Sequence, residues 1–146
     1  MDILLDTNIL LRFCNPTASQ HAEAVRAVLR LLATGEALHL ASQNLIEFWA
    51  VATRPVEANG LGWDTKKTHS QIEQFLDQFR LLDDSPAIFA HWWTLVTTHN
   101  VKGKNVHDTR LVAIMLTHGI THLLTFNTDD FRRFPHITLI HPNEVA

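Results

Sequence analysis

The sequence predicts an α/β fold, a three-layer sandwich built around a central, mainly parallel sheet of about five strands. Short apolar runs without polar alternation recur along the chain, which is the pattern of strands buried on both faces. Amphipathic segments of helical period separate these runs, and this alternation favours parallel strands joined by right-handed crossovers. The chain has 146 residues, of which 46% are hydrophobic, and this predicts one domain over residues 1–146.

The predicted strands are short and rich in branched or apolar side chains. The first, "ILL", is followed at once by Asp6, Thr7 and Asn8, which interrupt an otherwise apolar stretch. The last two, "THLLTF" and "ITLI", flank the polar segment "NTDDFRRFP", for which a turn or a short helix is expected. In chain order, the predicted strands span residues 3–5, 37–41, 80–84, 121–126 and 137–140.

Apolar residues at helical spacing predict the helices between these strands. In the first helix, Ala22, Val25, Val28, Leu29 and Leu32 recur at the spacing of one buried face. The predicted helices span residues 19–35, 42–55, 65–79, 86–100 and 106–119.

Residues at the ends of these segments carry helix start and stop signals. Ser42 and Asp64 are candidate N-caps, and Ser85 followed by Pro86 is a strong helix start. Gly119 is a plausible helix end, because glycine readily adopts the left-handed conformation found there. The segmentation of the chain therefore has a residue-level cause at most of its boundaries.

Composition excludes several classes of protein. The formal net charge of −3 is not the footprint of a tight, non-specific nucleic-acid binder, so an RNA-binding role needs a local basic rim or metal ions. Cys14 is the only cysteine, which excludes an internal disulfide and a thiolate metal site. No apolar run is long enough to span a membrane, and no signal peptide is recognisable. We therefore expect a cytoplasmic protein without a membrane association.

Polar residues that can carry chemistry fall at one predicted edge of the sheet. Asp6 follows the first strand, Glu47 lies one to two turns into the helix after the second, and Asp108 lies in the first turn of the helix before the fourth. Ligands of open parallel sheets bind at the carboxyl ends of the strands, so these residues can converge. The segment after the fourth strand adds Asn127, Asp129 and Asp130.

A cluster of carboxylates repels itself unless it shares protons or binds a cation. An all-oxygen set with few histidines suits Mg²⁺ or Mn²⁺ rather than zinc. Taken singly, each residue has a simpler explanation: Asp6 as a turn residue or helix cap, Asp108 as a carboxylate favoured by the helix dipole. The prediction of a metal site therefore depends on the set.

Three blocks of sequence resemble the PIN-domain ribonucleases. They are "LLDTNILLR" at the start, "NLIEFWAV" around Glu47 and "NVHDTRLVAIMLTHGITHLLTFNTDDF" near the end, in this order and spacing. The resemblance covers essentially the whole chain and is strongest to the VapC-like toxins of bacterial toxin–antitoxin pairs. It implies a Rossmann-like PIN fold, Mg²⁺- or Mn²⁺-dependent cleavage of RNA, frequent homodimers and a small antitoxin that blocks the site.

Carried over by position, the acidic residues of the family fall on Asp6, Glu47 and Asp108, which are the expected metal ligands and catalytic residues. The fourth falls on Asn127, an amide, so Asp129 or Asp130 is a candidate to supply the missing charge. One carboxylate fewer leaves open whether one or two ions bind. Supporting roles are expected for Thr7, Asn8 and Thr125, with Asn8 orienting the first carboxylate.

An alternative function remains open on the same residues. Because Asn127 departs from the acidic pattern, the chain can also be a degenerate PIN-like module that binds RNA or a protein without cutting. The sequence names neither the RNA target nor an antitoxin. Among the aromatic residues, Trp49, Trp92 and Phe89 are expected to pack in helix interfaces, and a basic rim is expected from Arg12, Lys102, Lys104, Arg110, Arg132 and Arg133.

Overall fold

The computed structural model describes residues 1–146 and contains a five-stranded sheet in which every strand pair is parallel. The strands lie in the order β3-β2-β1-β4-β5, so the first strand occupies the centre of the sheet. This confirms the predicted fold class and all five predicted strands. Their bounds are β1 Asp2–Leu5, β2 Ala37–Leu40, β3 Arg80–Leu81, β4 His122–Leu124 and β5 Thr138–Ile140.

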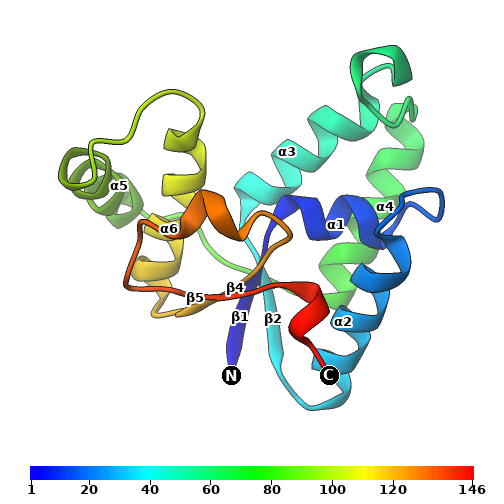
Figure 1. Ribbon diagram of the computed structural model, residues 1–146. Coiled ribbons are helices and arrows are strands. Elements are labelled where there is room, and N and C mark those ends of the chain that lie inside the picture. The colour runs from blue at the N-terminus through cyan, green and yellow to red at the C-terminus, as the bar shows by residue number, and fades with distance from the viewer.

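Helices cover both faces of the sheet and make the outer layers of the sandwich (Figure 1). Helices α5 and α6 lie on one side, and α1 to α4 lie on the other. The α-helices are α1 Thr7–Phe13, α2 His21–Ala33, α3 Ser42–Thr53, α4 Thr65–Gln78, α5 Pro86–Thr98 and α6 Asn105–His118. Three short 3₁₀ helices are η1 Val56–Ala58, η2 Thr128–Phe131 and η3 Pro142–Glu144.

The alternation of side chains along β1 divides the hydrophobic core into two halves. Leu4 points into the cluster under α5 and α6, together with Leu123 of β4. Ile3 and Leu5 point into the opposite cluster under α1 to α4, together with Leu124. Because both faces of the central strands are buried, these strands read as continuous apolar runs, as the sequence predicted.

Helix α1 is the one α-helix that the sequence did not predict. Asp6 precedes it with an extended backbone (φ −74°, ψ 157°), and its side chain accepts a hydrogen bond from the backbone N–H of Thr7. The chain therefore turns directly from strand into helix at the polar residues that interrupt the apolar stretch. Leu5 of the strand and Ile9 of the helix are both fully buried, so both elements are apolar in sequence and the boundary between them is hard to recognise.

Two expectations about helices were wrong. Ser42 is not an N-cap but the first residue of α3; Ala41 caps the helix instead, and its backbone N–H donates to Asn44 Oδ1 at 2.9 Å. In α2, Leu29 and Leu32 are 53% and 39% exposed, since the helix turns Ala24, Ala27, Val28 and Leu31 to the core.

The other boundary signals are confirmed. The side chain of Asp64 caps α4 through the N–H of Lys67 at 2.7 Å, and Ser85 caps α5 with Pro86 in its first turn. Gly119 ends α6 with a positive φ of 68°. None of these helices is long and apolar enough to cross a membrane.

Candidate active site

Asp6 lies at the carboxyl end of the central strand with only 7% of its surface exposed. Its Oδ1 accepts from the backbone N–H of Thr7 at 2.7 Å, and its Oδ2 accepts from the hydroxyl of Thr125 at 2.8 Å. The amide of Asn8 also donates to Oδ2, at 3.2 Å. Three donors thus hold one buried carboxylate in a fixed orientation.

Asn8 and Thr125 form a frame that ties α1 to the end of β4. The Asn8 amide donates to Thr125 Oγ1 at 3.1 Å, and Asn8 Oδ1 accepts from the backbone N–H of Phe126 at 3.1 Å. Thr125 Oγ1 also accepts from the backbone N–H of Asn127 at 3.0 Å. Residues separated by more than a hundred positions in sequence are therefore locked together around Asp6.

Thr7 connects the first carboxylate to Glu47. Its hydroxyl donates to Glu47 Oε1 at 2.9 Å and accepts from the amide of Asn44 at 3.2 Å. Glu47 is half-buried in the second turn of α3, where the sequence placed it. Thr7 therefore joins Asp6 and Glu47 in one hydrogen-bond network, because its backbone N–H donates to the first carboxylate and its hydroxyl to the second.

Asp108 lies in the first turn of α6, as predicted, and is half-buried. Burial, the largest cause, and the negative charges of Asp6, Asp130 and Glu47 together raise the pKa of Asp108 to about 7, while Lys104 acts in the opposite direction. A carboxyl of this kind titrates near neutrality rather than well below it.

The pKa of Asp6 is also raised, to about 6. Burial is the largest cause, and the charges of Glu47 and Asp130 act in the same direction. Hydrogen bonds from Thr125 and from the backbone of Thr7 lower it again, because they favour the charged form. The four carboxylates therefore form one electrostatically coupled cluster at the edge of the sheet.

The segment after β4 places its three candidate residues differently. Asp130 is half-buried and its charge acts on both Asp6 and Asp108. Asp129 is 87% exposed at its side chain and pairs with Arg132 Nε at 2.6 Å. Asn127 is exposed. Of the three, only Asp130 contributes a charge to the cluster.

The donor set suits a hard divalent cation. It consists of carboxylate, amide and hydroxyl oxygens. The pKa values of Asp6 and Asp108 are raised mainly by burial and further by neighbouring carboxylates, and a bound cation would offset both effects. As the side chains stand, no group of three or more His, Cys, Asp or Glu lies close enough together to hold a metal ion.

Sequence reasoning missed two polar residues that hold the site together. Asn44 is fully buried and links Ala41 to Thr7, and Gln43 is 9% exposed and donates to the backbone oxygen of His107 at 2.8 Å. The sequence did contain an indication of this role, because two amide side chains lie in the first turn of a helix that directly follows a buried strand. Buried amides must be hydrogen-bonded, so their position predicts a structural role.

A PIN-domain family model matches residues 3–137. The chain belongs to the PIN-domain family. This match spans every element from β1 to η2 and includes all the candidate site residues. A comparison with curated protein sequences finds no match.

Solved structures of VapC and VapBC proteins share the fold over almost their whole length. VapBC2 from Rickettsia felis, bound to a promoter DNA fragment, is 20% identical, with a TM-score of 0.72 over 97% of this chain and 98% of that one. VapBC-1 from nontypeable Haemophilus influenzae is 16% identical, with a TM-score of 0.73 over 98% and 99%. Mycobacterium tuberculosis VapC20, a Sarcin-Ricin loop cleaving toxin, is 18% identical, with a TM-score of 0.69 over 90% and 95%. At these identities the likeness shows the fold alone.

Proposed function

We propose that this PIN-domain protein is an Mg²⁺- or Mn²⁺-dependent endoribonuclease and the toxin of a toxin–antitoxin pair. One observation carries the proposal. Four carboxylates come from four separate parts of the fold near the carboxyl edge of the sheet: the charges of Glu47 and Asp130 act on both Asp6 and Asp108, and Asp6 also acts on Asp108. Such a cluster gains from a divalent cation, and a cation also makes it compatible with a phosphodiester.

The roles follow from the surroundings of each side chain. Asp6 and Asp108 are the proposed direct ligands, because both are short side chains at element ends whose pKa values are raised by burial. Glu47 has the longer reach and is held by Thr7, so it orients the attacking water. When bound, the ion lowers the pKa of its water and stabilises negative charge on the phosphoryl oxygens.

The hydrogen-bonding residues around Asp6 are proposed as positioning residues. Asn8 and Thr125 donate to Oδ2 of Asp6 and fix its orientation, and the hydrogen bond from Thr125 also favours the charged form that binds a cation. Asp130 is the proposed source of the fourth charge, since Asp129 is engaged by Arg132 at the surface. Asn127 supplies its backbone N–H to Thr125 and not a charge.

The proposed partners are an RNA substrate, a small antitoxin and a second copy of the chain, in the cytoplasm. Support comes from structures of similar fold that are toxin–antitoxin complexes, among them one from Klebsiella pneumoniae at 22% identity. A homodimer is further favoured by a shallow apolar hollow on α3 and α4, lined by Leu45, Ile46, Trp49 and Ile72.

Cleavage of labelled RNA with Mg²⁺ or Mn²⁺ tests the proposed activity. We expect Asp6→Asn and Asp108→Asn to lose cleavage by at least about 100-fold, since each removes a ligand charge at the reacting phosphate. Asp77→Asn, an exposed carboxylate on α4 outside the cluster, is the matched control and stays active. Full activity of Asp6→Asn would refute the assignment.

The position of Asn127 favours one second candidate function, a PIN-like module that binds RNA without cutting it. The same assay separates the two candidates. A nuclease shortens the RNA in a metal-dependent manner, and chelation of the metal stops it. A binding module retards the RNA but leaves its length unchanged with either metal.

A further inference from the structure

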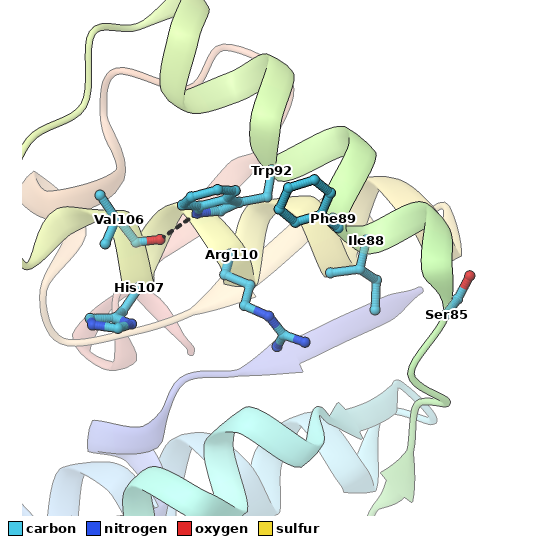
Figure 2. A pocket seen from close by; sticks show the side chains of 7 residues that line it. All are labelled: Ser85, Ile88, Phe89, Trp92, Val106, His107 and Arg110. Atoms are coloured by element: carbon cyan, nitrogen blue, oxygen red, sulfur yellow. Dashed lines mark hydrogen bonds between the residues drawn. The ribbon is translucent and has the colours of Figure 1, made fainter.

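A cavity of about 440 Å³ lies between α5 and the first turns of α6, the helix that carries Asp108. Its walls include Ile88, Phe89 and Trp92 from α5 and His107 and Arg110 from α6 (Figure 2). His107 and Arg110 belong to the same first turns of α6 as Asp108, so the cavity lies along the helix that carries one of the carboxylates. It has no role in the proposed metal chemistry.

Aromatic rings form one wall of the cavity. Trp92 donates its indole N–H to the backbone oxygen of Val106 at 2.8 Å, which fixes the ring against α6 (Figure 2). The Phe89 ring lies 5.8 Å from Trp92 and 6.1 Å from Trp93, and it stacks on the latter at 22°. Phe89 is 65% exposed, so the expectation that it packs in a helix interface was wrong. Exposed aromatic surface next to a cavity indicates a binding site.

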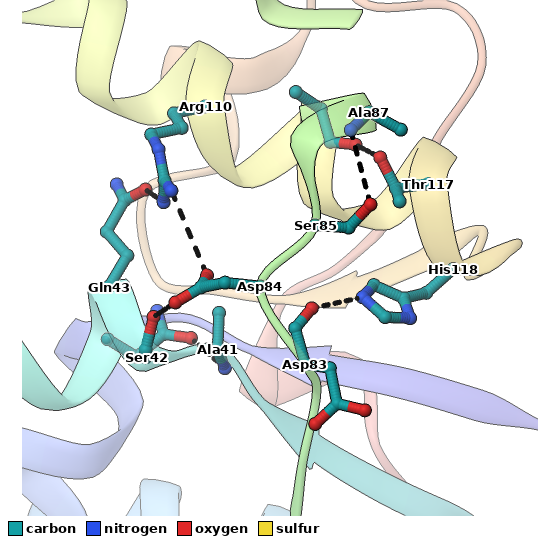
Figure 3. Close-up of polar contacts among 12 residues, drawn as sticks. Ala41, Ser42, Gln43, Asp83, Asp84, Ser85, Ala87, Arg110, Thr117 and His118 are labelled. Carbon is teal, nitrogen blue, oxygen red and sulfur yellow. Dashed lines mark hydrogen bonds and ion pairs between the residues drawn. The ribbon is translucent and has the colours of Figure 1, made fainter. Parts of the chain in front are cut away.

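A tethered guanidinium forms the opposite wall. Arg110 donates from Nη1 to Gln43 Oε1 at 2.9 Å, and its Nη2 lies 3.8 Å from Asp84 Oδ1 (Figure 3). Asp84 is itself held by the hydroxyl of Ser42 at 2.8 Å. These contacts orient the planar guanidinium from one side and leave its Nε–H without a protein acceptor.

We infer that this cavity is a nucleobase subsite, which holds one unstacked base of single-stranded RNA against Phe89 and Trp92 beside the scissile phosphate. The inference rests on the proposed function, because the carboxylate cluster must bind the neighbouring phosphate. Flat aromatic faces and a planar guanidinium are the groups that recognise splayed bases. The basic side chains of Lys104 and Arg110 lie on either side of Asp108 and attract the RNA backbone.

Charge favours RNA over a protein segment as the occupant. The chain as a whole carries a net charge of −3, yet Arg110 lines this cavity and Lys104 stands at the N-terminus of the same helix, α6. Lys104 is near enough to Asp108 to lower its pKa. These two cations attract a polyanion to this end of α6, where the exposed ring of Phe89 lines the cavity.

Binding of short oligouridylate and oligoadenylate, followed by fluorescence anisotropy, tests the subsite. All variants are made in the chain with its carboxylate cluster intact, with Mg²⁺ present and with oligonucleotides whose backbone resists hydrolysis, so the readout does not depend on cleavage. We expect Phe89→Ala to weaken binding about 5- to 150-fold, the range found when one stacking side chain is removed. Phe89→Tyr keeps a ring and restores the affinity. Leu29→Ala, which removes an exposed apolar side chain from α2, leaves it unchanged.

A second binding measurement uses a ribose-phosphate chain of the same length that carries no bases. If a base occupies the cavity, the abasic chain binds the parent weakly, and Phe89→Ala weakens it no further. Equal affinity of Phe89→Ala and the parent for the oligonucleotides overturns the inference. So does a loss of self-association in Phe89→Ala with unchanged RNA affinity, because the surface is then an interface between copies.

The proposed function fails in a different way. If the unsubstituted chain does not cleave RNA with any divalent metal, the endoribonuclease proposal is refuted. Base-dependent binding that requires Phe89 would still show that the cavity holds a nucleobase. The two results come from separate measurements and cannot be mistaken for each other.

Discussion

Asp6 performs two tasks with one carboxylate. Its Oδ1 accepts from the backbone N–H of Thr7 at the start of α1, while its Oδ2 is held by Thr125 and Asn8 at the edge of the cluster. Burial opposes its charge, and these donors offset only part of that penalty. The metal-free protein therefore carries an electrostatic cost at the position where the proposed chemistry needs a negative group.

This cost predicts a pH dependence of folding without metal. Between about pH 4 and 6 the folded protein binds more protons at Asp6 than the unfolded chain does, because the pKa of Asp6 is raised from 3.8 to about 6. The free energy of unfolding is therefore highest at acid pH and falls as the pH rises through 6. The shift corresponds to at most about 3 kcal/mol. Urea unfolding in chelator, across this pH range, measures it.

Asp6→Asn is the control for that measurement. The amide is neutral at every pH and keeps the side chain's size, so the variant loses the Asp6 contribution to the slope. At pH 7 without metal we expect it to be more stable than the parent. If the free energy of unfolding of the parent instead rose relative to that of the variant as the pH increased, the explanation would be contradicted.

Asp129 and Asp130 offer a matched pair of neighbours. Asp130 acts on the charges of Asp6 and Asp108, whereas Asp129 points to the surface and pairs with Arg132. We expect Asp130→Asn to lower metal-dependent cleavage by about 10-fold or more and Asp129→Asn to change it little. Measured initial rates with both metals test this, and the reverse order would assign the fourth charge to Asp129.

The sequence predicted the acidic residues of the cluster better than the polar residues that support them. Asp6 and Asp108 stand out because each lies where a predicted element ends or begins, and Glu47 stands out as a charge within an apolar helical stretch. The roles of Asn44 and Gln43 depend on which helices come together, because their partners lie on α1 and α6. The sequence pattern around Asn44 and Gln43 does not show which helices pack against each other.

At the scale of elements, α1 depends on the residue that also serves the site. An N-cap side chain contributes roughly 0.5–2 kcal/mol to a helix, and asparagine caps about as well as aspartate. We therefore expect Asp6→Ala to be less stable than Asp6→Asn by about 1 kcal/mol, although neither variant cleaves RNA. Thermal or urea unfolding in chelator measures the difference. Equal stabilities would show that the cap contributes nothing.

Element boundaries were predicted where a residue alone determines them. Asp64, Ser85 and Gly119 act through their own backbone or side chain, and the structure confirms all three. The helix was predicted to begin at residue 42, as α3 does, but its N-cap was assigned to Ser42 instead of Ala41, because Asn44 reaches back to Ala41 and leaves Ser42 free to bind Asp84. Helix α1 was missed because seven residues are too few to show a helical period.

At the scale of the whole molecule, the central strand explains why the fold was predictable. The strand β1 is paired on both sides and buried on both faces, so its residues are apolar without alternation. The crossovers that follow place the carboxyl ends of β1, β2 and β4 at one edge. Residues distant in sequence meet there because of topology, which the alternation of strands and helices already predicts.

The central claim is that these carboxylates share a divalent cation, and anomalous scattering from crystals soaked in Mn²⁺ tests it most directly. We predict a manganese peak within bonding distance of Asp6 and Asp108, with Glu47 or Asp130 nearby, and no such peak in crystals of Asp6→Asn. Density that leaves these carboxylates without an ion at saturating Mn²⁺ would contradict the account.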